Sequence, residues 1–157
     1  MDTGLKQRQA IEPLQVLLIG NNPIELGAVL DKFKQIRSQR IVTEIAFDLK
    51  SIVERLMRFK PNFIFIDDNL GRTALLETVK ALSVNRRTKD TPIAVLKNSN
   101  YHEALGASSI FDYLLKQNLS PDELYKTLTS SIRLRRTQLY LHQAYQKRKR
   151  QLLHALR

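Results

Sequence analysis

Three charged side chains stand where a folded chain could place chemistry. Asp67, Lys97 and Lys116 each close or follow a short apolar run. If these runs are parallel strands, the three side chains reach the sheet edge formed by the carboxyl ends, where open α/β sheets place their ligands. A carboxylate between two lysines can be held in ion pairs, and two lysines at such an edge can instead attract a phosphate. Both interpretations start from the same placement.

The elements that would position these residues follow from the hydrophobic pattern. Short apolar runs of strand length cover residues 14–19, 41–46, 63–66, 93–96 and 110–115. Apolar residues recur at helical spacing in segments 26–33, 49–56 and 75–82, and segment 101–106 is expected to add a short helix. Ser120 followed by Pro121 predicts the start of a last helix. Such alternation predicts a five-stranded parallel sheet with helices on both faces.

Composition excludes several classes of protein. The 157 residues suffice for one domain with a core, and 43% hydrophobic with 26% charged residues indicates a folded chain. Without cysteine there is no thiolate site, and three scattered histidines do not suggest zinc. No membrane segment or signal peptide is evident, so a cytoplasmic location is expected. No catalytic triad or glycine-rich phosphate loop is present, so we expect no enzyme activity.

The net charge of +11 divides the chain into unequal parts. Residues 1–123 hold 17 basic and 15 acidic residues, a net of +2, and residues 124–157 hold 9 basic residues and no acid, a net of +9. We therefore expect a flexible segment at 1–11, a folded domain at 12–130 and a basic helical extension at 131–157.

The pattern resembles the receiver domain of two-component response regulators over residues 12–130. The resemblance rests on three stretches, Pro61 to Asp67, Thr91 to Leu96 and Asp112 to Lys116, within the alternating strands and helices. It implies a flavodoxin-like, doubly wound (βα)5 sheet whose site lies at the carboxyl ends of the strands. It also implies a role in phosphorelay signal transduction.

The same resemblance assigns roles to individual residues. Asp67 falls at the phosphoacceptor position, Lys116 at the lysine that reaches the phosphoryl group, and Tyr113 at the aromatic switch position. Magnesium would be held by Asp67, by the backbone carbonyl of Asn69 and by Asn21. No residue is expected to act as a catalyst of its own.

Two departures weaken this site. Gly20 and Asn21 stand where the resemblance calls for an acidic pair, and Lys97 stands where it calls for a hydroxyl. Magnesium favours anionic oxygen ligands, so any magnesium binding should be weak and no other cofactor is expected. We predict that Lys97 and Lys116 together neutralise Asp67, which makes it a structural anchor in a degenerate receiver. The alternatives are a solvent-facing Lys97 beside an open anion site, and a working receiver phosphorylated at Asp67.

The pattern of the basic helical extension indicates which partners to expect. No proline or glycine follows Pro121, which favours one long helix. A heptad track for a homodimer would pass through Leu128, Ile132, Arg135, Leu139, His142, Tyr145, Lys149, Leu152 and Leu156. The basic clusters 133–136 and 147–150 could bind nucleic acid, but the lack of a helix-turn-helix disfavours sequence-specific binding. A protein partner, such as a sensor kinase or other signalling protein, or self-association is favoured.

Overall fold

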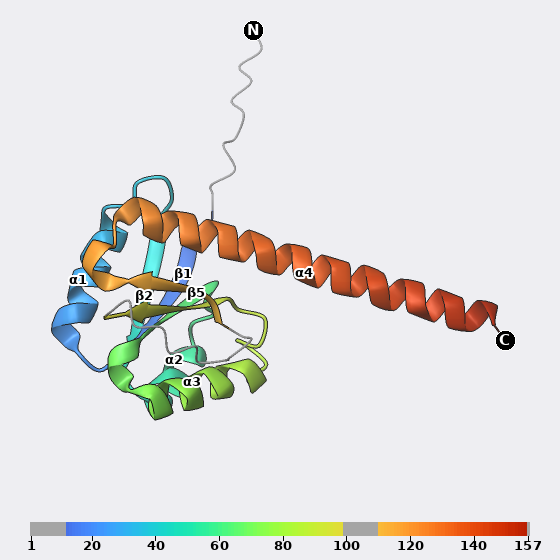
Figure 1. Cartoon of the computed structure of the whole chain (residues 1–157), viewed down its shortest axis with the longest axis horizontal. Helices are drawn as coiled ribbons and strands as arrows, with labels where there is room; N and C mark the ends of the chain where they lie inside the picture. The colour runs from blue at the N-terminus through green and yellow to red at the C-terminus, as the bar shows by residue number, and fades with distance from the viewer. Residues whose placement is uncertain (1–11, 99–109, 157) are drawn as a thin grey trace, which may run out of the picture.

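The computed structural model describes residues 12–98 and 110–156, which contain one five-stranded parallel sheet (Figure 1). The strands are β1 (Leu14–Ile19), β2 (Ile41–Ala46), β3 (Phe63–Asp67), β4 (Ile93–Lys97) and β5 (Ile110–Leu115). Their order in the sheet is β2-β1-β3-β4-β5, and every neighbouring pair is parallel. The predicted flavodoxin-like sheet is thereby confirmed.

The first three helices follow β1, β2 and β3, as the hydrophobic spacing predicts, and the last helix follows β5. They are α1 (Pro23–Lys34), α2 (Leu49–Leu56), α3 (Arg72–Val84) and α4 (Pro121–Ala155), with short 3-10 turns η1 (Asp68–Leu70) and η2 (Lys116–Asn118). The helix expected at 101–106 and the flexible segment expected at 1–11 lie outside the described residues.

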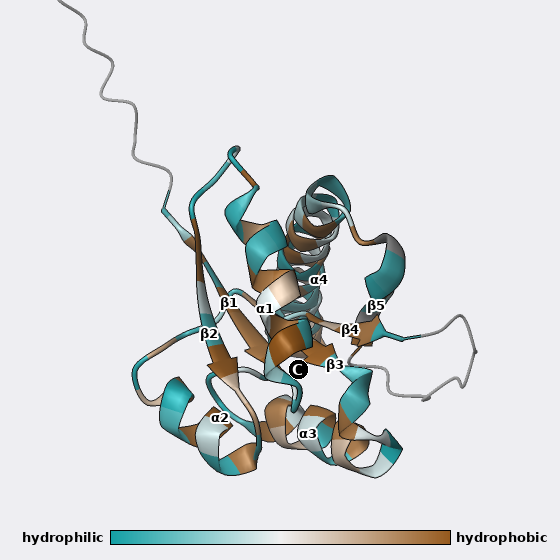
Figure 2. Ribbon diagram, turned by 90° about the vertical axis from the view of Figure 1, so that its left-hand side faces the viewer, coloured by the Kyte–Doolittle hydropathy of each residue, from teal (hydrophilic) through white to brown (hydrophobic). Residues whose placement is uncertain are grey.

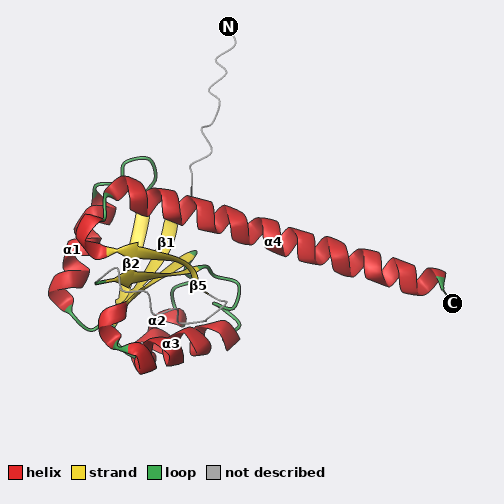
Figure 3. Cartoon of the chain, viewed as in Figure 1, coloured by secondary structure: helices red, strands yellow, loops and turns green. Residues whose placement is uncertain are grey.

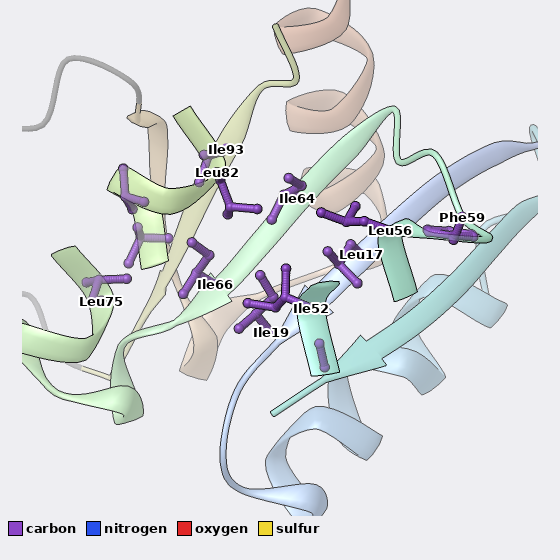
Figure 4. Packing of buried hydrophobic residues seen from close by; sticks show 13 residues of the cluster. Leu17, Ile19, Ile52, Leu56, Phe59, Ile64, Ile66, Leu75, Leu82 and Ile93 are labelled. Carbon is purple, nitrogen blue, oxygen red and sulfur yellow. The ribbon is translucent and has the colours of Figure 1, made fainter. Parts of the chain in front are cut away.

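Two apolar layers enclose the sheet, because successive side chains of a strand point to opposite faces. On one face the sheet packs against α2 and α3, and on the other against α1 and α4 (Figure 3). In β1, for example, Leu17 faces the α2 and α3 layer while Leu18 faces the α1 and α4 layer. Figure 4 shows the first layer from close by, and Figure 2 shows the apolar strands between amphipathic helices.

Local capping explains where the helices begin. The side chain of Asn22 accepts hydrogen bonds from the first turn of α1, and Asp48 forms a capping box with Ser51 at the start of α2. Ser120 accepts a hydrogen bond from the backbone N–H of Glu123, as the sequence predicts for the last helix. These caps satisfy backbone donors at the starts of α1, α2 and α4 and so fix which residues begin these three helices.

The last helix is much longer than the domain needs. Of the 35 residues of α4, only the first turns are buried, at Leu124, Thr127, Leu128 and Ser131. The rest projects away from the sheet (Figure 1). The boundary predicted between residues 130 and 131 therefore falls within a continuous helix. Among the described residues, no helix is long and apolar enough to cross a membrane.

Candidate functional site

Asp67 lies at the carboxyl end of β3 and is almost completely buried, with 1% of its surface exposed. Each of its carboxylate oxygens lies 2.8 Å from Nζ of Lys116, which follows β5 directly. The backbone N–H of Asn69 donates a further hydrogen bond of 2.9 Å to Oδ1 of Asp67. The structure thus brings Lys116 against Asp67, and the buried carboxylate is compensated by a charge-assisted hydrogen-bond pair.

Glu25 is a third member of this site that the sequence did not indicate. Its Oε2 lies 2.7 Å from Nζ of Lys116, and the side-chain amide of Asn69 donates to the same oxygen. Glu25 reaches the site because α1 follows β1 and begins at the same sheet edge as Asp67. The sequence offered one signal, an acidic residue in the first turn of a helix that starts at this edge. Helices in general favour acidic residues at their N-termini, so this signal does not single out Glu25.

Lys116 is consequently held between two carboxylates. Partial burial works to lower the pKa of Lys116, but the hydrogen bonds and negative charges of Asp67 and Glu25 outweigh it, so this pKa is raised. The ammonium group remains charged at neutral pH, and only 12% of the side chain is exposed. Lys116 therefore joins β5, β3 and α1 at one point, which we call the lysine clamp (Lys116, Asp67 and Glu25).

Two of the three groups that the resemblance assigns to magnesium, the carboxylate of Asp67 and the backbone carbonyl of Asn69, already have partners. The side-chain amide of Asn21 donates to the backbone carbonyl of Asn69 at 3.1 Å, and Lys116 engages both oxygens of Asp67. In the described part of the chain, no group of three or more acidic, histidine or cysteine side chains is placed to hold a metal ion. Magnesium prefers several anionic oxygens in octahedral geometry, so this donor set does not fit it while the lysine clamp is closed.

A second polar group borders the clamp. The backbone N–H of Asn98 lies 3.1 Å from Oδ2 of Asp68, and its side-chain amide donates to Oδ1 of Asp68 at 2.8 Å. The same amide also donates to Oδ1 of Asn69. Asp68 is thus occupied in joining η1 to the end of β4, and neither Asp68 nor Asn98 had been assigned a role from the sequence.

The predicted ion pair between Lys97 and Asp67 is wrong. Nζ of Lys97 lies 4.5 Å from the centroid of the Tyr113 ring, a cation–π contact. Alternation along the strands explains the difference, since Ile93 and Val95 of β4 face the α2 and α3 layer and Lys97 continues that row. Asp67 continues the row of Phe63 and Phe65 on the opposite face.

Tyr113 belongs to the same side of the sheet as Lys97. It is half-buried and packs against the α2 and α3 layer, and this burial raises the pKa of its hydroxyl. The residue is therefore part of the domain's packing in this state. Its role as a switch stays a prediction.

Gly20 follows β1, where the resemblance calls for an acid, and there is no room for one. A Cβ atom on Gly20 would lie 2.8 Å from Cδ2 of Leu26 and 3.1 Å from Cβ of Asp67. Leu26 is fully buried, so its side chain has little space to move away. Close packing of Gly20 against Leu26 and Asp67 thus disfavours an acidic side chain at this position.

Replacing this glycine tests the packing. Gly20→Ala is expected to lower the free energy of unfolding by about 1 to 2 kcal/mol, because the added methyl group overpacks the site. Gly27→Ala is the matched control, because a Cβ atom there meets nothing within 4 Å. That helical substitution should raise stability by about 0.5 to 1 kcal/mol. Urea denaturation measures both changes in the free energy of unfolding. Equal effects at the two glycines would contradict close packing at Gly20.

Comparison with known proteins relates this geometry to a fold. No family model matches the chain, and no curated protein matches it. Among solved structures, the signal receiver domain of an HD domain-containing protein from Pseudomonas fluorescens Pf-5 superimposes with a TM-score of 0.65 at 13% identity, covering 80% of this chain and 99% of that one.

Two further structures have the same fold. The receiver domain of the sensor histidine kinase PA1611 from Pseudomonas aeruginosa PAO1, which has a magnesium ion coordinated in its active-site cleft, gives a TM-score of 0.61 at 16% identity and covers 77% of this chain and 98% of that one. The chemotaxis response regulator CheY4 of Vibrio cholerae gives 0.59 at 21% identity, with 76% and 99% covered. This chain therefore has the fold of response-regulator receiver domains, continued by a long C-terminal helix.

Proposed function

We propose that this chain is a degenerate receiver domain of a signal-transduction pathway that acts through protein contacts and not through its own phosphorylation. The observation that supports this most directly is the lysine clamp. Lys116 bonds to both oxygens of Asp67 and to Glu25, and it would have to leave Asp67 before that carboxylate could attack a phosphoryl donor.

The chain also offers few ligands around Asp67 for the ion whose positive charge the reaction needs. Phosphoryl transfer depends on positive charge placed against the transferring group, which magnesium supplies in this fold when several oxygens are available to it. Here Gly20 offers no side chain and Asn21 is bonded to Asn69. A divalent ion would have to displace Lys116 from Asp67 and compete with the Asn21 side-chain amide for the carbonyl oxygen of Asn69.

The output is proposed to be self-association through the exposed part of α4. Large apolar side chains recur on this helix at intervals of seven and four residues, the spacing of a coiled-coil seam. We call this set the apolar seam: Leu134, Leu141, Tyr145, Leu152 and Leu156, each between 49% and 83% exposed. A second copy of the chain would cover the seam and leave the two receiver-like domains at one end.

The seam differs from the heptad track that the sequence suggested. That track begins at Leu128, which the domain buries completely, and continues through Ile132, which packs against the α1 and α4 layer. Those side chains are already used inside one chain. Only Tyr145, Leu152 and Leu156 belong to both sets.

A phosphorylation assay tests the proposal. Incubated with acetyl phosphate and magnesium, the full chain is expected to gain no phosphoryl adduct by intact mass, because Asp67 stays paired with Lys116. A receiver domain that binds magnesium in its cleft serves as the positive control.

The alternative function, a working phosphorelay receiver, makes the opposite prediction. It requires a stable adduct on the wild-type chain that disappears in Asp67→Asn. That result would overturn the proposed function, and a protein partner such as a sensor kinase would then have to be sought as the phosphoryl donor.

A further inference from the structure

A basic cavity lies at the opposite edge of the sheet from the lysine clamp. It has a volume of ≈ 380 Å³ and opens between the amino ends of β3 and β4, the loop before β4, and the middle of α4. Its charged lining consists of Lys60, Arg86, Arg87, Arg135, Arg136 and Asp90. Five cations against one acid leave a net charge of +4 in a concave space, which raises the local potential for anions.

This cavity is assembled from parts that the fold holds in place. Arg87 donates to the backbone carbonyl of Leu56, which fixes one guanidinium group in its wall. Pro61, Pro92 and Leu139 also line the cavity. Across residues 12–98 and 110–156, no ion pair is found for Lys60, Arg86 or Arg136. These three cations are therefore available to an external anion.

The cavity continues into a line of charge along α4. At about 100° per residue, Arg133, Arg136, Lys147 and Arg150 lie within one arc of about 100° on the helix, and we call these four the basic strip. Arg136 belongs to both the strip and the cavity. From Arg133 to Arg150 the strip runs for about 26 Å, at 1.5 Å per residue.

The position of the apolar seam relative to the basic strip bears on which kind of anion fits. The seam and the basic strip are centred about 150° apart around α4, so they face nearly opposite directions. An amphipathic helix that lies on a bilayer has the same two opposed faces, with its basic residues attracted to anionic headgroups. In this chain the seam is the surface proposed for self-association, and a seam covered by a second copy has no apolar face left for lipid. If two chains pair through the seam, both strips face outward, where an extended polyanion can reach them.

We propose that the basic cavity and the basic strip together bind the phosphodiester backbone of a nucleic acid, without reading its sequence. Four of the five cavity cations are arginines, whose planar guanidinium groups suit phosphate oxygens. Tyr140, which is 70% exposed and lies beside the strip, adds a ring on which a base can stack. The choice of a nucleic acid over a membrane rests on the proposed self-association, whereas binding itself needs only one chain, which carries both the cavity and the strip.

The experiment measures binding of labelled duplex DNA and of single-stranded RNA, each of about 30 nucleotides, to the full chain by fluorescence anisotropy between 50 and 200 mM salt. Neutralisation of about six phosphates predicts a slope of log affinity on log salt of about −5 for the duplex. The cavity variant Lys60→Gln, Arg86→Gln and Arg136→Gln should reduce that slope by about 3 and weaken binding at least tenfold at low salt.

A charge-matched control separates a built site from overall charge. Lys34→Gln, Lys50→Gln and Lys80→Gln remove three exposed cations that lie outside the cavity and the strip. This variant should bind within about twofold of the wild type. Equal losses in the cavity variant and in the control would overturn the proposal, as would the absence of binding at the lowest salt.

Two competitors test the chemistry of the ligand. Polyglutamate at equal charge should displace the nucleic acid poorly, and vesicles containing phosphatidylserine should not capture the chain more tightly than the duplex. Displacement by polyglutamate as effective as by unlabelled DNA would identify an acidic protein surface as the ligand, and preferential binding to vesicles would identify a membrane. Either result would contradict the proposal, whereas a failure of the phosphorylation test would leave it untouched.

Discussion

Lys116→Met is expected to lower the free energy of unfolding by about 3 kcal/mol, the loss typical of a buried ion pair that has lost one partner. Asp67 would keep a buried negative charge beside Glu25 with no cation within hydrogen-bond distance. Urea denaturation at neutral pH measures the loss as a shift of the midpoint. The size of the effect distinguishes a closed clamp from two solvent-screened surface charges, which would lose less than about 1 kcal/mol.

Lys97→Met is the matched control for this experiment, because it removes the second lysine at the same sheet edge. Within residues 12–98 and 110–156, the one interaction found for Lys97 is its cation–π contact with the ring of Tyr113, so we expect a loss of about 1 kcal/mol or less. The double variant Asp67→Asn and Lys116→Met should recover about half of the loss caused by Lys116→Met, because the buried charge is gone. A Lys97→Met loss as large as that of Lys116→Met would mean that Lys97 supports Asp67 after all.

The full chain is expected to dimerise, and Leu141→Gln with Leu152→Gln should raise the dimer dissociation constant at least about 100-fold. The reason is that both leucines lie in the apolar seam and are 59% and 61% exposed in a single chain. Each dimer would bury four such side chains, and burial of a leucine contributes about 1.5 to 3 kcal/mol. Sedimentation equilibrium over a range of concentrations measures the change.

Tyr140→Gln with Val84→Gln provides the control for the seam. These two side chains are at least as exposed as the two leucines, at 70% and 77%, but they lie off the seam. The control should leave the dissociation constant within about threefold of the wild type. A wild-type chain that stays monomeric at every concentration, or a control that dissociates as readily as the seam variant, would contradict self-association through these residues.

The fold could be predicted from the sequence because its signals are local and repeated. The strand 63–66 is apolar at every position, as expected for a strand covered on both faces, and the structure extends it by one residue to Asp67. The start of α4 at Pro121 followed from the capping serine. Such patterns need only neighbours along the chain, so the order of helices and strands was accessible.

The site was less accessible because its contacts join distant parts of the chain. Lys116 and Glu25 are separated by 91 positions, and nothing in the neighbourhood of Glu25 distinguishes it from an acid that favours a helix N-terminus. The position of Lys97 could have been inferred from strand alternation, since it continues the row of Ile93 and Val95. The resemblance to receiver domains instead favoured a position for Lys97 in the phosphate site.

The apolar seam shows a different limit of prediction from the sequence. Periodicity identifies apolar positions on a helix but not which of them its own domain covers. Leu128 and Leu141 look alike in the sequence, yet the domain buries the first completely and leaves the second 59% exposed. The faces of α4 became distinguishable only when the domain side was known.

The unbroken length of α4 gives the molecule a mechanical property. The part beyond Ile132 extends for about 35 Å, and no proline or glycine interrupts it. Its buried first turns begin five residues after Lys116. A tilt of those turns by about 10° would carry the free end through about 6 Å by lever geometry. Small rearrangements at the lysine clamp would therefore be magnified into displacements that a distant partner can sense.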